Sequence, residues 1–143
     1  MSKGNTFEND WLKAIFNATP IANLLDNAAS APLTSLYVSL HTADPGEAGD
    51  QSTSEISYTG YSRVAVARTA GGWTVTANSV SPVADIVFGA MTAGAGGTAT
   101  HAVVGTASTG AGKILYSGAL SPTIAVATGV TPRITTGSAI TED

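Results

Sequence analysis

The stretch Leu36-Tyr-Val-Ser-Leu-His-Thr-Ala-Asp-Pro-Gly-Glu-Ala-Gly-Asp50 decides how the rest of the chain is interpreted. Leu36, Val38 and Leu40 alternate with more polar residues, and this period of two indicates a strand with one buried face. The following Asp-Pro-Gly supplies turn chemistry: a side-chain acceptor, a fixed φ and a residue free to adopt positive φ. An acidic loop then leads to a second alternating segment over 61–67. We therefore expect this unit to be the nucleus of a β-sheet protein.

Further short extended segments follow this unit, separated by Gly- and Pro-containing breaks. They lie at 73–77, 86–88, 98–106, 114–116, 124–127, 130–135 and 139–141. No helical pattern lies between them, so parallel α/β folds are disfavoured. The sequence predicts a mainly β protein: a single-domain antiparallel β-sandwich or jelly roll with one short N-terminal helix.

The predicted helix covers residues 5–17. Asn5 fits its N-cap and Glu8 completes a capping box. Its apolar residues recur at helical spacing and form a stripe: Phe7, Trp11, Leu12, Ile15 and Phe16. Thr19-Pro20 is expected to end the helix, with a further turn over 21–26. We assign residues 1–30 to this helix and an arm, and residues 31–143 to the sandwich, within one domain.

The composition indicates a protein that binds other proteins. Charged residues make up 11% of the 143-residue chain, against roughly 25% in an average soluble domain, so little charge must be desolvated at an interface. The net charge of −4 and the scattered basic residues disfavour nucleic acid. No apolar run is long enough to cross a membrane, no signal peptide is expected, and there is no cysteine for a disulfide or zinc site.

The sequence contains no convincing catalytic group. His41 and His101 lack a Gly-x-Ser-x-Gly nucleophile elbow, and we interpret them as hydrogen-bonded strand residues. Asp85 has no carboxylate partner suited to glycoside hydrolysis. Glycine-rich segments near residues 94–99 and 112–113 lack the helix or the magnesium-binding hydroxyl of nucleotide-binding loops. We therefore expect no enzymatic activity, no catalytic residue, no cofactor and no metal.

Two surface features leave alternatives open. Asp44, Glu47, Asp50 and Glu55 lie close together in sequence on a predicted surface loop, and the spacing of the first three is unlike that of an EF-hand. A solvated acidic loop is the first interpretation, and a cation or a basic patch on a partner is the alternative. Trp73 follows a turn, where it either closes one end of the core or anchors an interface.

Several segments resemble a family of small tailed-phage virion proteins. They are residues 36–45, Tyr58-Thr-Gly-Tyr-Ser-Arg-Val-Ala-Val66, Asn9-x-Trp-Leu12, Thr100-His101, Leu115-Tyr-Ser-Gly-Ala-Leu120 and the end at 140–142. Members are often labelled tail-fibre proteins, and similar small proteins are capsid decoration, or cement, proteins with a jelly-roll fold. The resemblance implies a homotrimer on the capsid exterior that binds the major capsid protein.

Two functional hypotheses follow. In the leading one, the protein decorates the capsid and stabilises the head by bridging capsid subunits. In the alternative, it is a tail-fibre or tail-tip component that contacts the host through the Trp73 turn and residues 93–97. The candidate partner-contact residues are Phe7, Trp11, Leu12, Ile15, Asp44, Glu47, Asp50 and Trp73.

Overall fold

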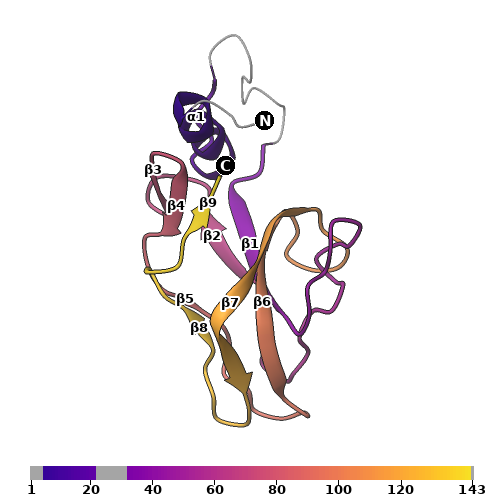
Figure 1. Cartoon of the computed structure of the whole chain (residues 1–143). Helices are drawn as coiled ribbons and strands as arrows, with labels where there is room; N and C mark the ends of the chain where they lie inside the picture. The colour runs from indigo at the N-terminus through magenta and orange to yellow at the C-terminus, as the bar shows by residue number, and fades with distance from the viewer. Residues whose placement is uncertain (1–4, 22–31, 143) are drawn as a thin grey trace. The chain divides into compact units, whose positions relative to one another are not determined.

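The computed structural model describes residues 5–21 and 32–142 (Figure 1). The chain divides into two compact units, each assembled from separate stretches of sequence. Unit 1 comprises Met1–Ser35, Val66–Asp85 and Thr135–Asp143, and unit 2 comprises Leu36–Ala65 and Ile86–Ile134. With 40% strand and 8% helix, the predicted mainly β class with one short helix is confirmed. The predicted boundary at residue 30 and the predicted turn over 21–26 fall largely outside the described residues.

Unit 1 pairs one helix with a small antiparallel sheet. Its elements are α1 (Asn5–Phe16), β3 (Trp73–Thr76), β4 (Ser79–Pro82) and β9 (Ile140–Thr141), with the strands in the order β3-β4-β9. The helix packs against β3 and β4. Leu12 and Phe16 from the predicted apolar stripe are completely buried there. This burial stabilises a helix that would be too short to persist alone. The helix is too short to cross a membrane, and no other helix is present among the described residues.

The end of α1 is held by a residue distant in sequence. Phe16 is the last helical residue, slightly before the predicted end, and Ala18 follows with φ of 53°. The guanidinium of Arg68 donates hydrogen bonds to the carbonyls of Ala14 and Ile15. Carbonyls of a last helical turn have no partner within the helix, and a cation there also interacts favourably with the helix dipole. Arg68 therefore ties the end of α1 to the rest of unit 1.

The turn between β3 and β4 contains an unfavourable residue, Ala77, whose φ is 53°. Replacing Ala77 by glycine should raise the free energy of unfolding by about 1 kcal/mol, because glycine has no Cβ to clash in this region. The turn carbonyl accepts a 2.8 Å hydrogen bond from the side chain of Asn9, a contact that the backbone of glycine preserves. Urea unfolding followed by tryptophan fluorescence measures the change. The exposed Ala84, which has no positive φ, is the control: Ala84→Gly should not stabilise. Equal effects at the two sites would contradict the prediction.

Unit 2 is built on a four-stranded sheet that contains the strand predicted by the opening stretch. The sheet contains β1 (Ser35–His41), β2 (Val64–Ala67), β6 (Gly97–Gly105) and β7 (Ile114–Val126), in the order β2-β1-β6-β7. Ser35 and the last two residues of β2 are assigned to unit 1. Strand β5 (Ile86–Val87) pairs separately with β8 (Arg133–Ile134). Leu36, Val38 and Leu40 are buried as expected. Ser39 and His41 are buried as well, so the second half of β1 is covered on both faces.

Strand β7 joins two segments that the sequence predicts to be separate. It pairs antiparallel with β6, with Ala119 opposite His101 and Ile124 opposite Ala99. Residues 120–123 of β7 therefore face Thr100 alone. Such an insertion is a bulge, which bends a strand and interrupts its ladder without ending it. Ser121-Pro122, expected to separate two strands, lies within this bulge.

Candidate functional site

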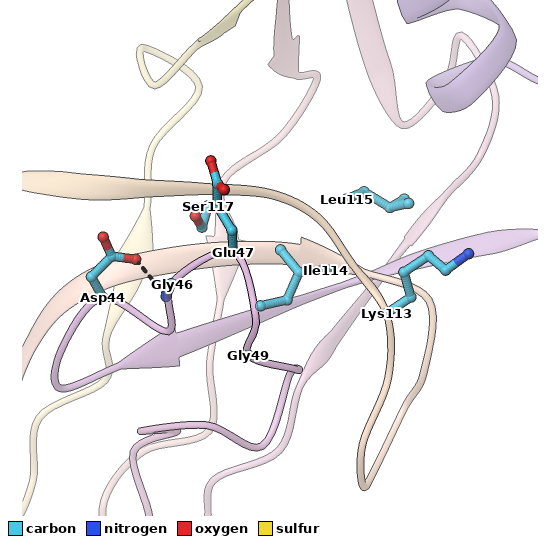
Figure 2. A pocket seen from close by; sticks show the side chains of 8 residues that line it. All are labelled: Asp44, Gly46, Glu47, Gly49, Lys113, Ile114, Leu115 and Ser117. Carbon is cyan, nitrogen blue, oxygen red and sulfur yellow. Dashed lines mark hydrogen bonds between the residues drawn. The ribbon is translucent and has the colours of Figure 1, made fainter.

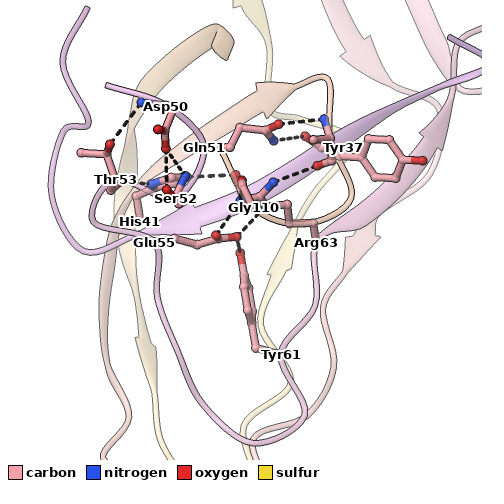
Figure 3. Close-up of polar contacts among 12 residues, drawn as sticks. Tyr37, His41, Asp50, Gln51, Ser52, Thr53, Glu55, Tyr61, Arg63 and Gly110 are labelled. Carbon is pink, nitrogen blue, oxygen red and sulfur yellow. Dashed lines mark hydrogen bonds and ion pairs between the residues drawn. The ribbon is translucent and has the colours of Figure 1, made fainter. Parts of the chain in front are cut away.

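A buried ion pair organises the loops of unit 2 (Figure 3). Arg63 donates two hydrogen bonds to the carboxylate of Glu55, from Nε at 2.8 Å and from Nη2 at 2.7 Å. The same guanidinium donates to the carbonyl of Ala107 at 2.9 Å and to that of Gly110 at 2.7 Å. The hydrogen bonds with Glu55 raise the pKa of Arg63, so the cation is maintained. One side chain thus connects the loop that follows β1 with the loop between β6 and β7.

Tyr61 attaches this ion pair to the central strand. Its hydroxyl donates a 2.9 Å hydrogen bond to Glu55 and accepts a 3.1 Å hydrogen bond from the backbone N–H of Leu40. Burial raises the pKa of Tyr61, so the hydroxyl keeps the proton that it donates. These hydrogen bonds therefore connect the acidic loop to β1 through Tyr61.

Gln51 makes a second connection between the same two loops. Its side chain is completely buried, donates to the carbonyl of Tyr37 at 3.2 Å and accepts from the backbone N–H of Ala107 at 2.9 Å. A side-chain carbon at Gly105 would lie 2.1 Å from the Gln51 amide carbon, so glycine is required at that position. The amide nitrogen and the amide oxygen of Gln51 therefore each have a hydrogen-bond partner, as buried polar groups normally do.

His41 is a structural histidine, which confirms its interpretation from sequence. Its ring is completely buried, Nδ1–H donates to the carbonyl of Thr53 at 2.8 Å, and Nε2 lies 2.9 Å from the hydroxyl of Ser39. Burial lowers the pKa of His41, so the ring is neutral and Nε2 accepts from Ser39. His101 is half-buried on β6 beside Thr100. Neither histidine contacts a carboxylate in the described hydrogen bonds.

The lowered pKa of His41 makes unit 2 sensitive to acid. The unfolded chain binds a proton near pH 6.5 more readily than the folded chain, so stability is complete above that pH and is lost as the pH falls. We expect the free energy of unfolding to decrease below pH 6.5 by at most about 1.4 kcal/mol per pH unit from this one group. Urea unfolding at pH 7.5, 6.5 and 5.5, followed by near-ultraviolet circular dichroism of the tyrosines, measures the loss. His41→Gln should make the decrease in the free energy of unfolding at low pH smaller. His101→Gln should leave this decrease in place, because His41 remains.

A groove lies between the acidic loop and the start of β7 (Figure 2). The loop contributes Asp44, Gly46, Glu47 and Gly49, and the other wall contains Lys113, Ile114, Leu115 and Ser117. Asp44 accepts a 2.9 Å hydrogen bond from the backbone N–H of Gly46, which is the turn chemistry that the sequence indicates. In Figure 2, Asp44 lies at one end of the groove and Lys113 at the other.

The structure separates the acidic residues that the sequence groups together. Asp44 and Glu47 are exposed and line the groove, but Asp50 does not. The carboxylate of Asp50 instead accepts hydrogen bonds from the hydroxyl and backbone N–H of Ser52, and these bonds lower its pKa. No group of three or more acidic or histidine side chains suited to a metal ion occurs in the described part of the chain.

The remaining candidate contact residues lie in unit 1. Trp73 is 2% exposed, and its ring meets that of Phe16 edge-on with centroids 4.7 Å apart, so it belongs to the core of the unit. Leu12 is buried beside them, whereas Trp11 and Ile15 are half-buried on the same helix. The side chain of Phe7 lies outside the described set. Trp11 and Ile15 are therefore the accessible part of the predicted stripe.

Sequence reasoning missed the β7 wall of the groove. From the sequence, Lys113 belongs to a loop without nucleotide-binding chemistry, and residues 114–116 are predicted only to be a strand. The available signal was charge: Lys113 is followed by thirteen residues of β7 without any charged side chain. Such a run on a strand is unusual unless the strand is covered.

A family model described as podophage GP4 fiber I protein gp80 matches residues 4–142. The chain belongs to this family. The gp80 match spans both units and confirms that the chain is a phage virion structural protein, as the resemblance of its motifs implies. No curated protein matches the sequence.

Proposed function

We propose that this protein is a non-catalytic fibre component of a phage virion. The observation that carries the proposal is the gp80 fibre-protein match over residues 4–142, which includes almost every residue of both units. The site supports an adhesive role. Three groups whose chemistry suits catalysis, Arg63, Glu55 and His41, have their hydrogen bonds directed to other groups of unit 2.

Capsid decoration is the second candidate. The low charged fraction of 11% favours a surface covered by other proteins, which both the head and the tail of a virion provide. In this candidate the major capsid protein is the partner and a homotrimer is the bound form. The two candidates differ in location and copy number, and the fibre description of the family favours the first.

The copy number and position of the protein in purified virions test the proposal. Quantitative mass spectrometry should find a small number of copies per particle relative to the major capsid protein. Immunogold labelling should place them at the tail, with an antibody to the major capsid protein marking the head as a control. Hundreds of copies distributed over the head would contradict the fibre role and support decoration.

The absence of catalysis is tested separately. The purified chain, incubated with host-surface polysaccharide, should release no reducing ends above a buffer control. Release that disappears in His101→Gln, at a half-buried side chain, or in Asp85→Asn, at an exposed one, would contradict a purely adhesive role.

A further inference from the structure

Part of strand β7 exposes a sheet edge without the usual protection. It is the last strand in the order β2-β1-β6-β7, so no described strand lies on its other side. An exposed strand edge is a template for pairing, and proteins normally blunt it with charged side chains, proline or bulges. In β7 the larger bulge and Pro122 lie at residues 120–123, and a smaller register shift leaves Leu115 unpaired between Ile114 and Tyr116. Residues 116–119, between these two irregularities, form the straight, uncharged part of the edge.

Small residues make this part of the edge accessible to another backbone. Ser117, Gly118 and Ala119 are all exposed. A side-chain carbon built at Gly118 would have no atom within 4 Å. A second strand can therefore approach residues 117–119 without displacing side chains.

The groove beside this edge has opposite charges at its two ends. Asp44 and Glu47 lie toward one end and Lys113 lies at the other (Figure 2). No ion pair joins Lys113 to either carboxylate among the described residues. A binding partner that complements the groove must therefore carry a cation and an anion in the reverse order.

We propose that this partner is a second copy of the chain, paired antiparallel through residues 116–119 of β7 about a two-fold axis. A two-fold rotation reverses the groove, so Lys113 of each copy meets Asp44 and Glu47 of the other. In this antiparallel arrangement, the edge N–H and C=O groups of each copy form hydrogen bonds with those of the other copy. The inference goes beyond the fibre proposal and does not depend on where the protein sits in the virion. A cyclic trimer would require a different contact, because head-to-tail copies do not share a two-fold axis.

Analytical ultracentrifugation of the full chain tests the pairing. The wild-type chain should form a dimer. Lys113→Glu should raise the dimer dissociation constant by about tenfold or more, because two attractive contacts become repulsive in each pair. Adding Glu47→Lys should restore the dimer by exchanging the two charges. Lys13→Glu makes the same charge change on α1 in unit 1 and should leave the dissociation constant unchanged.

A second variant tests the strand edge itself. Gly118→Lys places a charge in open space on β7 and should also weaken the dimer about tenfold or more, while far-ultraviolet circular dichroism confirms that the chain remains folded. A monomer at all concentrations, a trimer, or a dimer unaffected by both Lys113→Glu and Gly118→Lys would overturn the inference. None of these outcomes would alter the copy number measured in virions, so the two proposals fail separately.

Discussion

Replacing Phe16 by alanine should lower the free energy of unfolding of unit 1 by about 3–5 kcal/mol. The side chain is completely buried and its ring meets that of Trp73 at an interplanar angle of 67°. The substitution removes this contact and leaves a cavity between α1 and β3. The chain's two tryptophans, Trp11 and Trp73, both belong to unit 1, so the midpoint of urea unfolding by tryptophan fluorescence reports on this unit.

The control for Phe16→Ala is Ile15→Ala on the same helix. Because Ile15 is half-buried, Ile15→Ala should lower the free energy of unfolding distinctly less than Phe16→Ala does. A loss below 1 kcal/mol for Phe16→Ala would show that α1 does not contribute to the core of unit 1. Deleting residues 1–20, a natural test of an anchoring helix, would remove Leu12 and Phe16 together. It would therefore confuse loss of binding with loss of folding, and Trp11→Ser is the better test of a partner contact.

Replacing Arg63 by methionine should cost about 3–5 kcal/mol in unit 2, because it leaves the carboxylate of Glu55 without its cation in a largely buried position. The side chains of Arg63 and Glu55 are 2% and 17% exposed, so water compensates only in part. The carbonyls of Ala107 and Gly110 lose their donor as well. All four tyrosines lie in unit 2, and their near-ultraviolet circular dichroism follows its unfolding.

The double variant Glu55→Gln/Arg63→Met separates the charge from the remaining contacts. It should recover part of the stability that Arg63→Met loses, since no buried charge is left uncompensated. Arg133→Met, at an exposed position of β8, should change stability by less than about 0.5 kcal/mol. A loss of equal size at positions 63 and 133 would contradict a structural role for the ion pair.

Local patterns predicted the elements whose residues decide their own structure. The alternation of Leu36, Val38 and Leu40 located β1, and the helical spacing of Leu12 and Phe16 located α1 and its buried face. The turn at Asp44 followed from the short side chain, the proline and the glycine. In each case residues adjacent in the sequence determine the secondary structure, so the local pattern is enough to predict it.

Other features depend on contacts between distant residues and could not be read in this way. The sequence does not predict strand β4, because β3 and β4 are joined by a two-residue turn beginning at Ala77, and alanine rarely adopts positive φ. The guanidinium of Arg63 donates hydrogen bonds to the carbonyls of residues 107 and 110, and no residue near Arg63 in the sequence indicates these contacts. The groove likewise combines residues 44–49 with 113–117, which only the sheet order brings together.

The interleaved order of the two units has a consequence for biosynthesis. Unit 1 needs the strand β9, which pairs with β4 through Val80 and Ile140, whereas every segment of unit 2 precedes residue 135. On the ribosome, unit 2 is therefore complete while the sheet of unit 1 still lacks its last strand. Premature termination after residue 134 would release chains with an intact groove and a defective helix-bearing unit. Such products could compete with full-length chains during virion assembly, a dominant-negative effect that co-expression of the truncated form would reveal.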